Sequence, residues 1–158
     1  MFKTIIWATD GSETADGALP FARALAEAES GHLVAVHGKE IFVGGRATGV
    51  PVLADETELE AKIDQQVQEL RSVGVHATFE LISGMSTHAA QMIADVAREV
   101  GADVIVVGTR GHGPIAGAVI GSVTQQLLHL APCPVLAVPP AKQVAKRSQK
   151  REHAATAG

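Results

Sequence analysis

The residues with the clearest chemical potential lie in a glycine-rich stretch between two apolar segments. A β-branched run from Val104 to Val107 ends at Gly108, and a helical pattern begins at Ser122. The glycines in and around this loop are Gly108, Gly111, Gly113, Gly117 and Gly121. Glycine lets a ligand approach the backbone, and the first N–H groups of a helix carry partial positive charge. We therefore expect an anion site with phosphate as its natural occupant, where the Ser122 hydroxyl either caps the helix or donates to a phosphate oxygen.

A second group that could meet a ligand is the carboxylate of Asp10, which follows the first apolar run of the chain. It could hold a nucleotide-bound Mg²⁺ ion or accept a hydrogen bond from a ribose hydroxyl. The alternative is a structural role in an Asx-turn or helix cap that leads into Gly11 and Ser12. The residues alone leave both roles open.

Alternating strands and amphipathic helices must position these groups. Short apolar runs predict strands over residues 2–9, 33–37, 75–82, 104–107 and 135–138. Ser12 is a plausible N-cap of the first helix, which either begins near Leu19 or kinks at Pro20. The order β-α-β-α-β-α-β-α-β predicts an α/β fold, a single doubly wound (Rossmann-like) domain whose parallel sheet has helices on both faces. Ligands of such sheets bind at the carboxyl ends of the strands.

Helical spacing also predicts the buried side chains. On the first helix these are Ala18, Phe21, Ala22, Leu25 and Ala26. On the last helix they are Ile120, Val123, Leu127, Leu128 and Leu130. From Gly38 to Ala54 no pattern remains, and this glycine-containing loop either folds over a bound ligand or is a disordered insertion.

The composition favours one cytoplasmic domain. The chain has 158 residues, of which 46% are apolar, and a formal charge of −4 at pH 7. We expect one domain over residues 1–140 and a basic, disordered tail over residues 141–158. The acidic body argues against nucleic acid as a partner. Cys133 has no partner for an internal disulfide, and the N-terminal run is neither a signal peptide nor a membrane span, which indicates the cytoplasm and no membrane partner.

The glycine spacing is specific enough to suggest a family. Two residues separate Gly108 from Gly111, and nine more precede Gly121 and Ser122. This pattern resembles the G-x2-G-x9-G-[S/T] ATP-binding signature of the universal stress protein family, and the resemblance covers about residues 1–140. It implies the strand order 3-2-1-4-5, with the first and fourth strands adjacent. It also implies that these four residues hold the phosphates of ATP, and that Asp10 lies beside the nucleotide.

The same resemblance implies two further contacts. Gly38 would make main-chain contacts to adenine, although a larger apolar residue is often found there in the family. The last strand, Val135 to Val138, would pair with its copy in a homodimer. Candidates of lower rank for nucleotide contacts are Thr9, Arg110, His112 and Val123.

Three functions fit these observations. The first is an ATP-binding stress-response regulator that acts as a conformational switch. The second is a slow ATP hydrolase or phosphotransferase, for which Asp10, Arg110 and His112 are the only nominees, so no catalytic residue is assigned. The third is a nucleotide-free dimeric interaction module, which the intact glycine pattern disfavours. The chain has no P-loop motif and no dinucleotide fingerprint.

Overall fold

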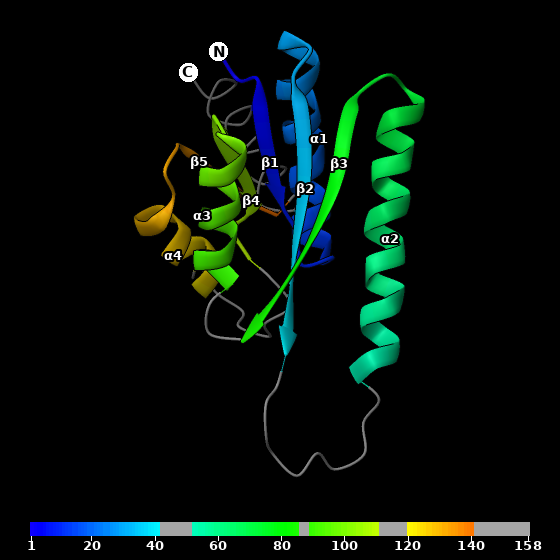
Figure 1. Cartoon of the computed structure of the whole chain (residues 1–158), viewed down its shortest axis with the longest axis vertical. Coiled ribbons are helices and arrows are strands. Elements are labelled where there is room, and N and C mark those ends of the chain that lie inside the picture. The colour runs from blue at the N-terminus through cyan, green and yellow to red at the C-terminus, as the bar shows by residue number, and fades with distance from the viewer. Residues whose placement is uncertain (42–51, 86–88, 111–119, 141–158) are drawn as a thin grey trace, which may run out of the picture.

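The computed structural model describes residues 1–41, 52–85, 89–110 and 120–140. Strands and helices alternate along these ranges. In chain order they are β1 (Thr4–Ala8), α1 (Glu13–Glu29), β2 (His32–Ile41), α2 (Val52–Ser72), β3 (His76–Met85), α3 (Ala89–Val100), β4 (Val104–Gly108), α4 (Ser122–Leu130) and β5 (Val135–Val138). All neighbouring strands pair in parallel in the order β3-β2-β1-β4-β5, which confirms the predicted doubly wound sheet (Figure 1).

The middle of the sheet is buried on both faces, where β1 and β4 have consecutive apolar side chains from Ile5 to Ala8 and from Val104 to Val107. Ile5 and Trp7 of β1 face one side, where they pack with side chains of α1 and α2. Ile6 and Ala8 face the other side and pack with α3 and α4. Successive side chains of a strand point to opposite faces, so a continuous apolar run is what a doubly covered strand requires.

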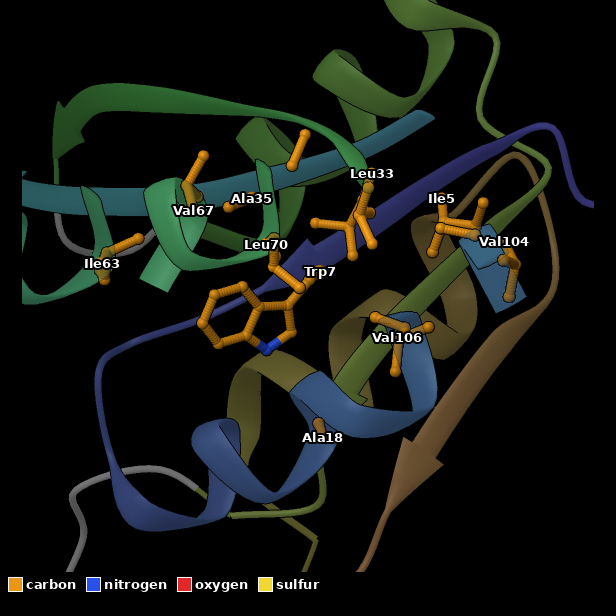
Figure 2. Close-up of a cluster of buried hydrophobic side chains, with 14 of the residues drawn as sticks. Ile5, Trp7, Ala18, Leu33, Ala35, Ile63, Val67, Leu70, Val104 and Val106 are labelled. Carbon is orange, nitrogen blue, oxygen red and sulfur yellow. The ribbon is translucent and has the colours of Figure 1, made fainter. Parts of the chain in front are cut away.

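Trp7 is the largest fully buried side chain of the core. Its ring lies between Leu70 of α2 and Ala18 of α1 (Figure 2). The indole Nε1 donates a hydrogen bond to the carbonyl oxygen of Ala15 at 3.0 Å. The buried stripe of α1 consists of alanines only, which lets the helix approach the sheet closely enough for this bond.

The structure corrects the predicted ends of two strands. β2 continues past His37 to Ile41, and β3 continues past residue 82 to Met85, with Gly38 opposite Ile82 in the shared ladder. These extensions lie beyond the central strands, where no core enforces apolar alternation, so periodicity could not reveal them. Of the predicted loop from Gly38 to Ala54, residues 38–41 therefore belong to β2 and residues 52–54 to α2. The remaining residues 42–51 lie outside the described residues, as does the predicted tail over 141–158.

The structure decides one alternative about the helices and corrects one expectation. A start of the first helix near Leu19 is excluded, because α1 runs from Glu13 through Pro20 and Ser12 caps its start. Three side chains expected in the core are exposed, namely Phe21 at 49%, Ile120 at 43% and Leu128 at 52%. Phe21 falls to the side of the alanine stripe by the helical period, and Ile120 precedes α4.

No helix within the described ranges is long and apolar enough to cross a membrane.

Candidate functional site

The carboxyl ends of β1 and β4 lie side by side at the point where the strand order reverses. Ala8 is paired with Val107 of β4 on one side and with Val36 of β2 on the other. Asp10 follows two residues later, so it lies at the end of the sheet between the two neighbouring strands. This is the position at which doubly wound sheets bind ligands.

The turn from Thr9 to Ser12 is ordered by its own side chains. Asp10 Oδ1 accepts a hydrogen bond from the Ser12 amide at 3.0 Å, and Thr9 Oγ1 accepts one from the Gly11 amide at 3.0 Å. Gly11 has a φ of +73°, which favours glycine. The Asx-turn considered for Asp10 is therefore present, and a contact of Asp10 with a nucleotide or Mg²⁺ stays a prediction.

The start of α4 is fastened to the end of β4. The Gly121 amide donates to the Thr109 carbonyl at 2.7 Å, and Thr124 Oγ1 donates to the Gly108 carbonyl at 2.8 Å. Gly121 is the N-cap and provides no side-chain hydrogen bond, and the first turn of α4 contains no acidic residue. Ser122 is the first helical residue and is exposed, so it does not cap the helix. The positive end of α4 thus points to the same end of the sheet as Asp10.

Gly108 has a packing role besides any role in binding. A Cβ atom at Gly108 would lie 2.8 Å from the carbonyl oxygen of Thr14, so the first turn of α1 approaches β4 as closely as glycine allows. Gly38 is different, because the nearest atom to a Cβ there would be Ala89 Cβ at 3.8 Å. The ladder between β1 and β2 ends at Val36, so Gly38 lies beyond the last pair of those strands.

The candidates of lower rank divide into three groups. Thr9 is buried, and Val123 packs against the core on the α3 and α4 side, so Val123 could offer a ligand only its backbone. Arg110 follows β4 closely and is half-buried. His112 lies outside the described residues, as does Gly111, which belongs to the main group of candidates.

Two polar residues of α2 support this turn, Lys62 directly and Glu56 through His37, and neither could be recognised from its neighbours in the sequence. Lys62 Nζ donates to the Gly11 carbonyl at 2.8 Å, and Glu56 Oε1 lies 2.8 Å from His37 Nε2. His37 Nδ1 in turn donates to the Thr9 carbonyl at 2.9 Å, so this buried histidine has a partner on each ring nitrogen. Because these partners are far apart in the chain, periodicity and motif spacing carry no signal for them.

The described parts of the chain offer little support for a metal site or for a reactive cysteine. No three His, Cys, Asp or Glu side chains gather there in a way that could hold a metal ion. Cys133 is partly buried, and burial, followed by the nearby charge of Asp103, raises the pKa of its thiol. A thiol with a raised pKa is a poor nucleophile, as expected of a packing residue.

Comparison with known proteins agrees with this architecture. The fold and site define a single doubly wound α/β domain with a glycine-flanked helix N-terminus at its topological switch point. The model of the universal stress protein family matches residues 1–139, so the chain belongs to that family.

Individual relatives are similar over nearly the whole domain. A universal stress protein from Thermus aquaticus is 34% identical over 146 residues, covering 87% of this chain and 99% of that protein. The structure of a universal stress protein from Archaeoglobus fulgidus superposes with a TM-score of 0.68 at 26% identity, covering 87% of this chain and 98% of that one. Another universal stress protein, crystallised in complex with cAMP, has a TM-score of 0.60 at 23% identity, covering 89% and 98%.

Proposed function

We propose that this protein is a cytoplasmic stress-response regulator that binds ATP and changes conformation on binding. The observation that carries the proposal is the N-terminus of α4, which is held at the end of β4 without an acidic residue in its first turn. The triphosphate would lie at this helix end, against the backbone of Gly108, Gly121 and Ser122, and Gly111 of the sequence pattern would complete the loop.

The remaining parts of the nucleotide would lie along the neighbouring strands. Asp10 would meet the ribose or a Mg²⁺ ion bound to the phosphates, because it follows β1 between β2 and β4. Adenine would lie against the backbone at Gly38, beyond the last β1–β2 pair. The strand order supports the placement of Asp10, and the contact of adenine with Gly38 rests on the resemblance to the family.

The direct test is calorimetry on nucleotide-stripped protein. We expect saturable binding of ATP near micromolar affinity, roughly 8 kcal/mol, with GTP and AMP weaker. Titration with cAMP belongs in the same series, because a family member was crystallised with that ligand. Absence of heat with every nucleotide up to millimolar concentration would overturn the proposal.

Asp10→Asn sharpens this test. The asparagine oxygen can still accept from the Ser12 amide, so the turn is retained while the charge is lost. A hydrogen bond to a charged group contributes about 1.5 to 3 kcal/mol, so ATP affinity with Mg²⁺ should fall roughly tenfold or more. Asp103→Asn, at the opposite end of the strands, is the matched control and should leave the affinity unchanged.

We further propose a homodimer through β5. This strand has β4 as its one neighbour in the described sheet, and Leu136 on it is 38% exposed. Pairing two β5 strands would satisfy the backbone groups of the open edge and cover this side chain.

Light scattering should give twice the chain mass of 16.4 kDa for the wild type, and Leu136→Lys should reduce the measured mass to that of one chain. Val73→Lys, at an exposed apolar residue after α2, should not, and a monomeric wild type would refute the dimer.

A further inference from the structure

The two carbonyl groups that flank Asp10 are each held by a side chain from another element. We propose that Lys62 and His37 are positioning residues of the nucleotide site, which fix the turn around Asp10 before a ligand arrives and couple that turn to α2. The inference rests on the proposed nucleotide binding at this turn. It adds that the contacts of Lys62 and His37 raise the affinity for the nucleotide.

The contacts on the turn are short and come from both sides. His37 Nδ1 donates to the Thr9 carbonyl at 2.9 Å, and the His37 side chain is 4% exposed. Lys62 Nζ donates to the Gly11 carbonyl at 2.8 Å and to Asp16 Oδ2 at 2.6 Å. Thr9 and Gly11 are the residues before and after Asp10, so the peptide group between Thr9 and Asp10 and the one between Gly11 and Ser12 are both restrained.

α2 supplies or supports each of these contacts from one face. Glu56, Leu59 and Lys62 are spaced by three residues, which places them on neighbouring positions of the helix surface. Glu56 Oε1 bonds His37 Nε2 at 2.8 Å. Leu59 packs on the turn so closely that a Cβ atom at Gly11 would lie 1.8 Å from its Cδ1. α2 begins at the end of the sheet where β1 and β2 end (Figure 1).

The buried ring of His37 joins the turn to α2. A carbonyl oxygen only accepts, so His37 Nδ1 is the donor in the bond to Thr9. On the other side of the ring, Nε2 lies 2.8 Å from Glu56 Oε1. The ring is thus held between the turn and α2, and a shift of α2 would change its contact with the Thr9 carbonyl.

Holding the turn in advance lowers the cost of binding. A free turn must be ordered when the ligand binds, and each ordered residue costs conformational entropy. Coupling is reciprocal, so a nucleotide that prefers the held turn must also strengthen its contacts with α2. The ion pair between Lys62 and Asp16 is largely exposed, at 42% and 30%, so it adds little to global stability. Removal of the Lys62 charge should therefore change the order of the turn more than the free energy of unfolding.

The experiment compares Lys62→Met with Lys3→Met in the full chain. Lys3 directly precedes β1 and is exposed, so the control removes the same charge at the opposite end of that strand from the turn. Without nucleotide, NMR should show faster amide exchange at Gly11 and Ser12 in Lys62→Met, by several-fold, and no change in Lys3→Met. ATP affinity should fall about three- to tenfold in Lys62→Met only, and Lys62→Arg should restore part of it.

The outcomes separate this inference from the proposed function. If the wild type binds ATP and Lys62→Met changes neither exchange nor affinity, the positioning role is overturned, and faster exchange with unchanged affinity overturns it as well. If the wild type binds no nucleotide, the proposed function fails, and exchange alone decides whether α2 holds the turn. Glu56→Gln, which removes the charge beside His37, should give a smaller change in the same direction, and an opposite change would contradict the link through His37.

Discussion

The two ends of the parallel sheet are both rich in hydrogen bonds, but these bonds act on different targets. At the amino-terminal end, the carboxylate of Asp103 accepts from the amides of Lys3 and Thr4, each at 2.8 Å. His32 Nε2 bonds Thr78 Oγ1 at 2.8 Å and its ring stacks on that of His76. These contacts join one strand or loop directly to the next, and they close the end of the domain.

At the carboxyl-terminal end, the bonds converge on one turn. His37 and Lys62 hold the carbonyls on either side of Asp10, and the start of α4 is tied to the end of β4. Side chains from β2 and α2 thus hold the turn that carries the carboxylate of Asp10, which is itself half-buried. Bonds between neighbouring elements are enough to close one end of the sheet. At the other end, bonds from several elements converge on one turn, as expected where a binding site is held in place.

The largest expected difference between the two ends of the sheet is in the effects of two glycine substitutions on stability and on ATP affinity. A Cβ atom at Gly31 would lie 2.8 Å from the Lys3 carbonyl oxygen, and one at Gly108 would lie 2.8 Å from the Thr14 carbonyl oxygen. Both clashes are with backbone, so we expect Gly31→Ala and Gly108→Ala each to cost about 1 to 3 kcal/mol of unfolding free energy. Gly108→Ala should also weaken ATP binding, while Gly31→Ala should not.

Chemical denaturation and calorimetry with ATP would measure both effects. Gly17→Ala is the control, because a Cβ atom at Gly17 in α1 meets nothing within 4 Å. Alanine in a helix interior is favoured over glycine by about 0.5 to 1 kcal/mol, so this variant should be slightly more stable. Equal losses of affinity in Gly31→Ala and Gly108→Ala would mean that the two ends are not functionally distinct.

The part of this molecule that could be predicted from the sequence is its buried framework. Runs such as that of β4 are apolar at consecutive positions because both faces are covered, and a short β-branched run that ends at a glycine predicts a buried strand. The outer ends of β2 and β3 escaped prediction because they extend beyond the last pair with β1, which is Ala8 with Val36, and their residues lack the apolar pattern of the central sheet. Exposed Phe21 shows the opposite error, in which a large apolar side chain at roughly helical spacing was assigned to the core.

The site was predictable only where the chain is locally unusual. The Asx-turn at Asp10 and the helix start at Ser122 follow from residues that are adjacent in sequence. The bond between Lys62 and Gly11 spans 51 positions, and a lysine on a helix surface looks the same whether or not it has such a partner. A glycine that makes room for a helix, as Gly108 does for α1, likewise looks the same as one that makes room for a ligand.

A smaller expected effect is the contribution of the Asp103 carboxylate to stability at the amino-terminal end of the sheet. The amide of Thr4, followed by that of Lys3, lowers the pKa of the Asp103 carboxyl group below its ordinary value of 3.8. Because the folded pKa is below the unfolded one, the contribution to stability is fully present above about pH 4 and is lost as pH falls through the folded pKa. Asp103→Asn should therefore lower the melting temperature at neutral pH, and the difference from wild type should shrink in acid.

Melting curves between pH 7 and pH 2.5 would show this convergence. Asp95→Asn is the control, because Asp95 pairs with Arg98 on the exposed surface of α3, where such pairs contribute little. Its melting temperature should stay near that of wild type throughout. A constant gap between Asp103→Asn and wild type at every pH would assign the loss to packing instead of the carboxylate. Since Asp103 touches no part of the turn around Asp10, ATP affinity should be the same in all three proteins, and a loss in Asp103→Asn would show that the two ends communicate through β1.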